Sequence, residues 1–327
     1  MSLLVMAKSA DPLDDLPHQA RIRSRKRAGA TVTIIADATG LSAKESARVE
    51  QELRAAALAI AGVTEARVAM TAAQTRRTLI AIGSGKGGVG KSTVSANLAI
   101  ALARLGKRVG LVDADVYGPS QPTLLGTAAK PEAHDDQLIP VAAHGIAFLS
   151  LGQLVSPGHA LAWRGPMATG ALAKLVDADW GDAELIIVDL PPGTGDVQLS
   201  LIQRSRPAGA IVVSTPQDLS LIDARRAVDL FNKMSVPVLG LIENMATYAC
   251  PHCGETSHPF GSGGAEAAAE EMGVPFLGRL PLSLAIREAS DAGTPPAAGN
   301  GPDAEAFMAL ARKLLEALGG PADATDP

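Results

Sequence analysis

A glycine-rich segment, SGKGGVGKST at residues 84–93, most constrains what this chain can fold into. It directly follows the apolar run TLIAIG at 78–83 and precedes a helical pattern, which is the strand, loop and helix order that a P-loop requires. Glycines let backbone N–H groups converge on phosphates because no Cβ obstructs the approach, and the helix that follows adds its positive N-terminal end. The segment therefore predicts a site for nucleotide phosphates.

Two side chains of this segment have defined tasks in a P-loop. Lys91 can reach the β and γ phosphates of ATP and act in catalysis, and the Ser92 hydroxyl can ligate Mg²⁺. The backbone around them is expected to cradle the phosphates. That cradle is expected to comprise Gly85, Lys86, Gly87, Gly88, Val89, Gly90, Lys91, Ser92 and Thr93.

Short apolar runs recur after the P-loop, and they are continuous rather than alternating. They are RVGLVD, ELIIVD, GAIVVS and PVLGLI, which begin at residues 108, 184, 209 and 237. Continuous runs suit parallel strands that are buried on both faces, and helical patterns lie between several of them. This alternation predicts an α/β fold with a doubly wound, mainly parallel sheet, closed by a last helix over 302–319.

Four regions are expected along the chain. Residues 1–27 end in the basic run RIRSRKR and are predicted to be a mobile tail, with a nucleic-acid arm as the alternative. Residues 28–75 are expected to form a small β-α-β domain. It comprises the strand TVTIIA, a helix from about Ser42 to Ile60, and the strand EARVAM, and Ser42 and Glu45 have the spacing of a capping box at the start of the helix. Residues 76–319 form the ATPase domain, and 320–327 a second tail.

Acidic residues follow two of the predicted strands. Asp113 and Asp115 end the run RVGLVDAD, at the carboxyl edge of the sheet where ligands bind. We expect Asp115 to orient or deprotonate the attacking water, and Asp113 to support the magnesium shell or the loop. A pair of turn-forming residues is the alternative. ELIIVDLPPGTGD looks like a Walker B strand and switch loop, in which Asp189 holds Mg²⁺ through water and the Gly193 amide senses the γ-phosphate.

The only two cysteines, Cys250 and Cys253, lie in YACPHCG beyond the strand at 237–242. A redox pair normally opens a helix, and Gly254 with the polar run after it argues against a helix here. Zinc accepts mixed cysteine and histidine ligands, and His252 and His258 are near, although His252 lies between the two thiols. An iron–sulfur cluster usually takes about four thiolates, twice the number that one chain offers.

Lys86, directly after Gly85, stands where deviant P-loop ATPases that resemble MinD, ParA and the nitrogenase iron protein carry a signature lysine. That resemblance implies that Lys86 reaches the nucleotide of a facing subunit, and hence an ATP-dependent homodimer. A symmetric dimer would bring two copies of Cys250 and Cys253 to one axis, which gives four sulfur ligands.

GKGGVGKST, VDADVYGPSQP, DLPPGTGD, STPQ, IENM with CPHC, and GRLPLSLAIREASDAGTP occur in the order seen in Mrp-type iron–sulfur cluster carrier ATPases. The resemblance covers roughly 78–315. It implies a slow ATPase that holds a [4Fe–4S] cluster between two subunits and passes it to apoproteins, with assembly machinery as a further partner. It also implies that Asn244 binds adenine, with a loop cap as the alternative. The unit at 31–70 resembles the later half of the small domain often fused ahead of this ATPase.

Two further functions remain open at this point. A positioning or partitioning ATPase would use a membrane or DNA, but the end of the chain is acidic and the only dense basic cluster is RIRSRKR. A reductase would pass electrons through a cluster that it keeps. The net charge of −5 does not favour nucleic acid, and no apolar run reaches the ~18 residues of a membrane helix. With two cysteines and no secretory signal, we expect a cytoplasmic protein without a membrane partner.

Overall fold

The structure is a computed structural model that describes residues 12–38, 41, 43–71, 77–134, 137–154 and 165–319. The chain divides into two compact units, Met1–Arg76 and Arg77–Pro327. In the described residues, none of the helices has the length and apolar character needed to cross a bilayer.

The small unit is a three-stranded sheet covered on one face by a helix. Its elements are η1 (Pro12–Asp15), η2 (Gln19–Arg21), β1 (Ile22–Ala28), β2 (Thr31–Asp37), α1 (Ala43–Leu58) and β3 (Glu65–Thr71). The strand order is β1-β2-β3, with β1 antiparallel and β3 parallel to β2. Val32 and Ile34 of β2 pack with Leu53 of α1 in a core that is separate from those of the large unit. The predicted β2, α1 and β3 are therefore confirmed to within two residues, although Ser42 lies outside the described residues.

The tail predicted over 1–27 is corrected by the structure from Pro12 onward, because the basic run forms strand β1. Its arginines have partners: Arg23 pairs with Asp37, Arg25 with Asp14, and Arg27 donates to the Ala61 carbonyl at 3.0 Å. Partnered charges and the ladder to β2 let a polar segment join the sheet. Residues 1–11 and the second predicted tail, 320–327, lie outside the described residues.

The large unit contains an eight-stranded sheet in the order β15-β12-β11-β4-β10-β5-β9-β8. Every neighbouring pair is parallel except β8 with β9. The strands of this sheet are β4 (Thr78–Gly83), β5 (Val109–Asp113), β8 (Val141–Ala143), β9 (Ile146–Ser150), β10 (Leu185–Asp189), β11 (Gly209–Ser214), β12 (Val238–Glu243) and β15 (Phe276–Arg279). Two small hairpins lie outside it: β6 (Glu132–His134) with β7 (Gln137–Ile139), and β13 (Tyr248–Ala249) with β14 (Thr256–Ser257).

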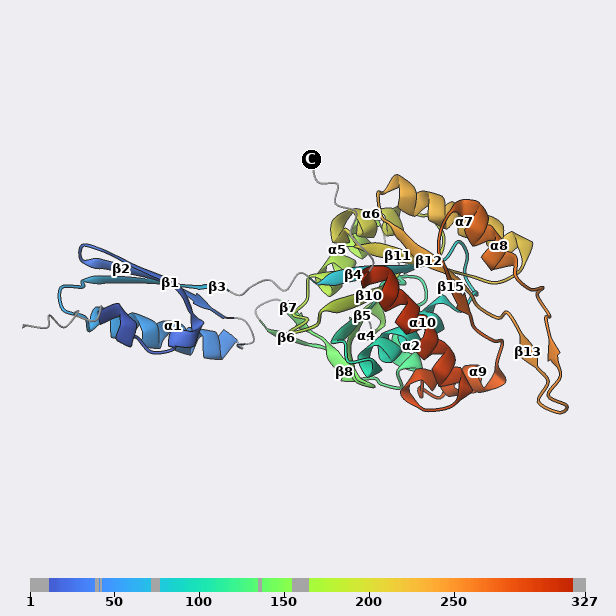
Figure 1. The fold of residues 1–327 in the computed structure, drawn as a ribbon, viewed down its shortest axis with the longest axis horizontal. Helices are drawn as coiled ribbons and strands as arrows, with labels where there is room; N and C mark the ends of the chain where they lie inside the picture. Colours follow the sequence, from blue (N-terminus) through green and yellow to red (C-terminus); the bar gives the residue numbers. More distant parts are fainter. Residues whose placement is uncertain are drawn as a thin grey trace, which may run out of the picture. The chain divides into compact units, whose positions relative to one another are not determined.

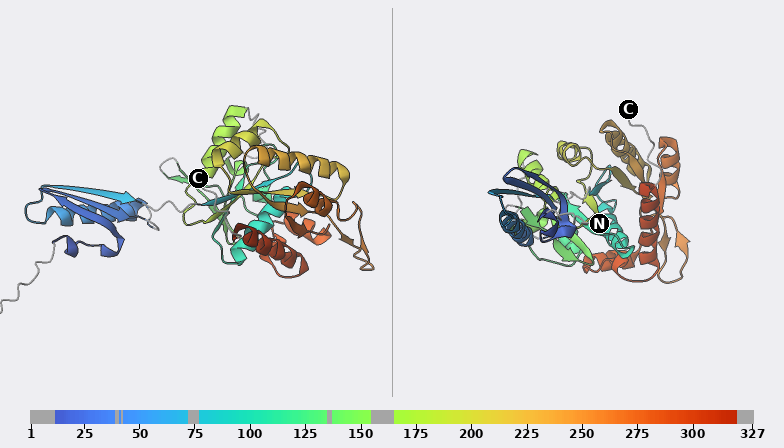
Figure 2. Two further views of the ribbon diagram at one scale, coloured as in Figure 1. Left: turned by 45° about the horizontal axis from the view of Figure 1, so that its top comes forward. Right: turned by 60° about the vertical axis from the view of Figure 1, so that its left-hand side comes forward.

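Helices cover both faces of this sheet (Figures 1 and 2). One apolar core lies against α5 (Gly165–Val176), α6 (Asp196–Ser205), α7 (Asp218–Lys233) and α8 (Gly264–Met272). The other lies against α2 (Lys91–Arg104), α9 (Leu284–Asp291) and α10 (Pro302–Gly319). The short elements α3 (Gln121–Leu124), α4 (Leu151–Leu154) and η3 (Pro296–Ala298) complete the unit. The predicted doubly wound, mainly parallel fold is confirmed.

The sheet topology brings the acidic strand ends together. β4 and β5 lie on either side of β10, and the register pairs Asp189 with Asp113 on one side and with Ile82 on the other. All three strands run parallel, so the P-loop after β4 and the two aspartates share one carboxyl edge. β5 and β10 are buried along their whole length and β4 over its last four residues, which is why these sequences lack polar alternation.

Candidate nucleotide and thiol sites

The P-loop surrounds a cavity of about 240 Å³ at the carboxyl edge of the sheet. The cavity is lined by Ser84, residues 86–93, Asp115, Ser120, Leu124 and Pro192. Gly90 begins α2 with a φ of 82°, and a Cβ there would lie 2.2 Å from Asn244 Nδ2. Only glycine meets both conditions. The predicted P-loop thus has the open space and the helix start that bound phosphates require.

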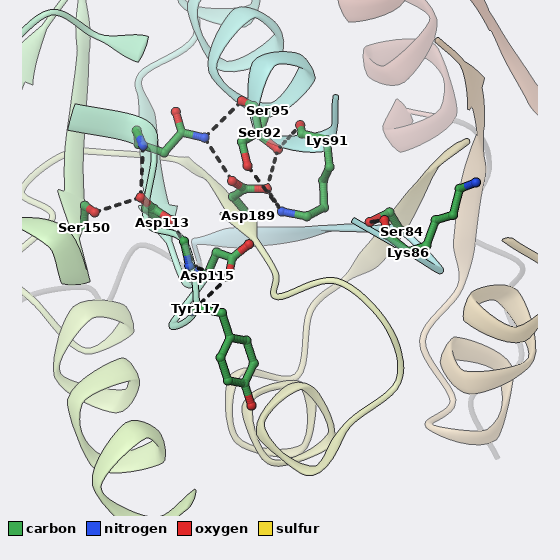
Figure 3. A network of polar contacts seen from close by, with 12 residues as sticks. Ser84, Lys86, Lys91, Ser92, Ser95, Asp113, Asp115, Tyr117, Ser150 and Asp189 are labelled. Carbon is green, nitrogen blue, oxygen red and sulfur yellow. Dashed lines mark hydrogen bonds and ion pairs between the residues drawn. The ribbon is translucent and has the colours of Figure 1, made fainter. Parts of the chain in front are cut away.

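Lys91 and Asp189 form a buried ion pair at the floor of this site (Figure 3). Asp189 has no exposed surface, and Lys91 Nζ also lies 3.5 Å from Ser92 Oγ. The ammonium group therefore sits between a carboxylate and a hydroxyl, the kind of oxygen donors that Mg²⁺ prefers. Because these two oxygens already accommodate a cation, the residues fit the predicted magnesium site.

Gln121 is a member of this network that the sequence analysis did not single out. Its side-chain amide donates to Asp189 Oδ2 and to the Ser92 carbonyl, both at 3.0 Å, and its backbone N–H donates to Asp113 Oδ2 at 3.0 Å. Ser95 Oγ adds a bond of 3.0 Å to Asp189 Oδ1. The signal for Gln121 was the motif VDADVYGPSQP, in which a glutamine follows the acidic strand end within ten residues. Gln121 thereby joins β5, β10 and the P-loop.

Asp113 is fully buried beside Asp189. Its Oδ2 accepts hydrogen bonds from Ser150 Oγ at 2.8 Å and from Gln121 N–H at 3.0 Å. Burial, and then the charge of Asp189, raise the pKa of Asp113 to about 7, although these two hydrogen bonds act in the opposite direction. Asp113 does not line the phosphate cavity. Of its two predicted tasks, this geometry favours support of the loop over a place in the magnesium shell.

Asp115 does line the phosphate cavity. Its Oδ1 accepts hydrogen bonds from the backbone N–H groups of Tyr117 at 3.1 Å and Gly118 at 3.2 Å. These bonds fix the carboxylate at the edge of the space where a γ-phosphate and its attacking water would lie. The turn-forming role weighed for Asp115 is thus compatible with the catalytic one.

The switch loop after β10 contacts the P-loop through its backbone. The Gly193 N–H, predicted to sense the γ-phosphate, donates to the Ser84 carbonyl at 2.9 Å, and Ser84 Oγ donates to the Lys86 carbonyl at 2.9 Å. The amide of Gly193 must therefore leave Ser84 before it can bind a phosphate.

Lys86 differs from Lys91 in its direction. Its side chain points away from the Asp189 network (Figure 3), and it is half-buried at the rim of the phosphate cavity. Gly85 just before it packs against α7, where a Cβ would lie 2.1 Å from the Asp223 carbonyl. The backbone of the loop is thus fixed while the lysine at its rim is directed outward.

Asn244 lies at the end of β12 and joins the P-loop to a second cavity of about 280 Å³. Its Nδ2 donates to the Val89 carbonyl at 2.8 Å. The second cavity is lined by Gly90, Thr93, Val94, Leu124, Asn244, Met245, Pro281, Leu282, Ser283, Ile286, Arg287, Ser290, Asp291 and Phe307. Gly90, Thr93 and Leu124 also line the phosphate cavity, so the two spaces adjoin.

The two cysteines lie in the turn of the hairpin formed by β13 and β14, which extends away from the sheet (Figure 1). Cys250 is half-buried and Cys253 is exposed, and both are free thiols. The backbone amides of Cys253 and His252, together with the Cys253 thiol, lower the pKa of the Cys250 thiol. A lower pKa favours the thiolate, which is the form that binds metal. Neither cysteine lines the two cavities.

Within the described residues, no three side chains of His, Cys, Asp or Glu gather as a set of metal ligands. His258, weighed as a zinc ligand, has its Nδ1 3.1 Å from the Ala246 carbonyl oxygen. The thiol pair therefore offers an incomplete ligand set within the described part of one chain.

A parallel sheet, a P-loop between β4 and α2, and a buried acidic residue at the end of the adjacent strand define a P-loop NTPase. Residues 75–315 match the sequence model of the family described as the NUBPL iron-transfer P-loop NTPases. The chain belongs to this family.

Similar proteins agree with this assignment. An iron-sulfur cluster carrier protein of Pseudomonas fragi is 48% identical over 241 residues, which cover 72% of this chain and 84% of that protein. An iron-sulfur protein required for NADH dehydrogenase, from Arabidopsis thaliana mitochondria, is 46% identical over 73% of this chain and 78% of its own length. Among solved structures, a nucleotide-binding protein of Archaeoglobus fulgidus in complex with ADP is 36% identical with a TM-score of 0.59, over 71% of this chain and 91% of that one.

Proposed function

We propose that this protein is an ATP-hydrolysing iron–sulfur cluster carrier, in which a [4Fe–4S] cluster is held between two subunits and passed to apoproteins. The observation that carries the proposal is the thiol pair on an exposed hairpin, which offers two ligands in a chain that also has a P-loop. About four thiolates are usual for a cluster, and a symmetric dimer would supply them from two copies of Cys250 and Cys253.

The two adjoining cavities support binding of a nucleotide across both. Its phosphates would lie in the P-loop cavity, and its base would lie in the second cavity beside Asn244. The side chain of Asn244 lines the second cavity and donates to the Val89 carbonyl, so its amide would turn from Val89 to an adenine edge. Half of the residues that line the second cavity have apolar side chains, among them Phe307, which suits the face of a purine.

Hydrolysis would follow from rearrangement of the buried network. When phosphates enter, Lys91 would leave Asp189 for the β and γ phosphates, and Ser92 and Asp189 would hold Mg²⁺, the latter through water. Bound Mg²⁺ neutralises charge on the β and γ phosphates. Asp115 would orient or deprotonate the attacking water, while Gln121 and Ser95 keep Asp189 in place. Gly193 would exchange the Ser84 carbonyl for the γ-phosphate.

The outward direction of Lys86 supports a role across the dimer, where it would reach the nucleotide of the facing subunit. Acceptors would be apo iron–sulfur proteins, and assembly machinery would load the cluster in the cytoplasm. Slow turnover coupled to cluster binding or transfer fits a carrier, because the cargo and not the phosphate is the useful product.

Anaerobic reconstitution with iron and sulfide tests this function. We expect about four irons per two chains and transfer of the cluster to an apo-acceptor. Cys250→Ala or Cys253→Ala should remove the cluster absorption while ATP binding persists, because neither thiol lines the nucleotide cavities. A normal iron–sulfur spectrum from either variant would contradict the assignment of the thiols. A cluster that stays bound through turnover would favour a reductase over a carrier.

A further inference from the structure

A short stretch of chain connects the nucleotide cavities to the thiols. Cys250 lies six residues after Asn244. Asn244 is held through both its side chain and its backbone. The side-chain amide donates to the Val89 carbonyl at 2.8 Å, and the backbone N–H donates to the Ser214 carbonyl at 2.8 Å. Met245, the next residue, has a φ of 59°, a left-handed conformation that is uncommon for a side chain of this size. Such conformations persist where the surroundings fix them.

Ala246 is the residue at which this stretch meets the base of the hairpin. It is buried, its N–H donates to the Leu280 carbonyl at 2.9 Å, and its own carbonyl lies 3.1 Å from His258 Nδ1. A carbonyl can only accept, so Nδ1 is the protonated nitrogen of His258. His258 directly follows β14, so this bond ties the returning strand of the hairpin to the segment that leaves Asn244.

The second attachment of the hairpin also leads to the nucleotide cavity. Leu282 N–H donates to the Thr247 carbonyl at 2.7 Å, and Pro281 and Leu282 line the same cavity as Asn244 and Met245. Both segments to which the hairpin is attached therefore border the cavity in which we place the adenine base.

The hairpin itself has little to hold it in position. β13 and β14 pair over only two residues each, and the turn adds bonds from Cys250 N–H to Glu255 O at 2.9 Å and from Gly254 N–H to Cys250 O at 2.8 Å. A two-stranded hairpin on its own is at best marginally stable. Ser257 Oγ adds a bond of 3.4 Å to the Tyr248 carbonyl within the hairpin. The placement of the thiols therefore depends on contacts at the base, and the His258 bond is a side-chain contact there.

We propose that His258 is a positioning residue that couples the occupied nucleotide site to the cysteine hairpin through the Ala246 carbonyl. This inference rests on the proposed function, and it names the route by which nucleotide acts on the cluster ligands. A ligand beside Asn244 and Met245 adds to the restraint on Ala246, and His258 passes that added restraint to the returning strand, so the turn that carries Cys250 and Cys253 opens less often.

Hydrogen exchange of the full-length, cluster-free, reduced protein tests the coupling. Exchange over residues 248–257 is compared with and without saturating AMP-PNP and Mg²⁺. In the wild type we expect nucleotide to slow exchange by about threefold or more, since one net hydrogen bond changes a local opening equilibrium by that factor. In His258→Ala this ratio should fall toward one, because the His258 bond is gone and only the bond from Leu282 N–H to the Thr247 carbonyl still joins the hairpin to the cavity.

A matched pair of variants separates coupling from mere support. The amide of His258→Asn can occupy the place of Nδ1 and should retain the nucleotide effect, whereas His258→Gln has the same chemistry but a longer reach and should lose most of it. His144→Ala, which removes another histidine–carbonyl bond, to Leu125, should behave as wild type. A residue that only supports the hairpin would raise exchange equally with and without nucleotide and leave the ratio unchanged.

An unchanged ratio in both His258→Ala and His258→Gln would overturn the coupling, as would a wild-type ratio of one in protein shown to bind AMP-PNP. Neither result touches the carrier function, because no cluster is present in this assay. Failure of the carrier function would appear instead as a reconstituted protein without about four irons per two chains.

Discussion

Asp113 has a buried carboxyl group whose surroundings disfavour its ionised form. Its pKa of about 7 lies well above the value of about 4 expected in the unfolded chain. Between these two pH values the folded chain holds a proton that the unfolded chain has lost. The free energy of unfolding therefore falls as pH rises from about 4 to about 7, by up to ~1.4 kcal/mol per pH unit.

Asp113→Asn should remove this dependence in the nucleotide-free protein. We expect the variant to gain stability relative to wild type as pH rises through this window, because the wild type must bury a charge and the amide need not. Urea unfolding of both proteins at several pH values from 4.5 to 7.5 measures the difference. A difference that does not vary with pH would mean that Asp113 titrates normally in the folded state.

The motif predicts single residues well where chemistry dictates them. Lys91, Ser92 and Asp189, which the motifs single out, lie together in one network, and their roles toward phosphate and Mg²⁺ stay a prediction. The motifs do not identify Gln121, because its role depends on contacts with Asp113 and Asp189, which end two strands far from each other in the sequence. A glutamine shortly after a strand has many ordinary uses, and only the folded chain shows that this one, at the start of α3, joins two strands.

At the scale of elements, the P-loop contains two glycines that differ in whether the structure leaves room for a side chain. Gly90 has a φ of 82° and Asn244 Nδ2 2.2 Å from any added Cβ, whereas a Cβ on Gly87 would meet nothing within 4 Å. We expect Gly90→Ala to lower the free energy of unfolding by ~1–3 kcal/mol through backbone strain and the clash, and Gly87→Ala to change it by less than ~0.5 kcal/mol. Thermal unfolding of the nucleotide-free variants compares them. Equal losses would show that the loop adapts to either methyl group.

The elements that the sequence predicted best are those whose burial leaves a simple pattern. β4, β5, β10, β11 and β12 all appear where continuous apolar runs predicted them, because both of their faces are covered. β1 did not, because its pattern is IRSRKRA and its stability comes from partners such as Asp37 and Asp14 elsewhere in the chain. A strand at the edge of a sheet that is held by ion pairs and by backbone hydrogen bonds to one neighbour shows no periodic pattern of apolar residues.

At the scale of the whole molecule, the roles that we propose for the thiol pair and for Lys86 both require a second subunit. If Lys86 acts across a dimer, each nucleotide site combines Lys91 of one subunit with Lys86 of its partner. A heterodimer of a Lys86→Ala chain and a Lys91→Ala chain then has one site with both lysines intact and one site with neither. If Lys86 acts within its own chain, both sites of that heterodimer are defective.

Two affinity tags on the two variant chains allow this heterodimer to be purified in the presence of ATP. Action across the dimer predicts about half of the wild-type ATPase rate per dimer, although each variant alone is impaired, because a symmetric dimer carries two equivalent sites. A doubly tagged dimer with Lys91→Ala in both chains should be inactive, and one of wild type with Lys91→Ala should also give about half. Activity no higher than that of the Lys86→Ala homodimer would place Lys86 on its own nucleotide. Failure to recover a doubly tagged dimer of two wild-type chains in ATP would count against the ATP-dependent dimer itself.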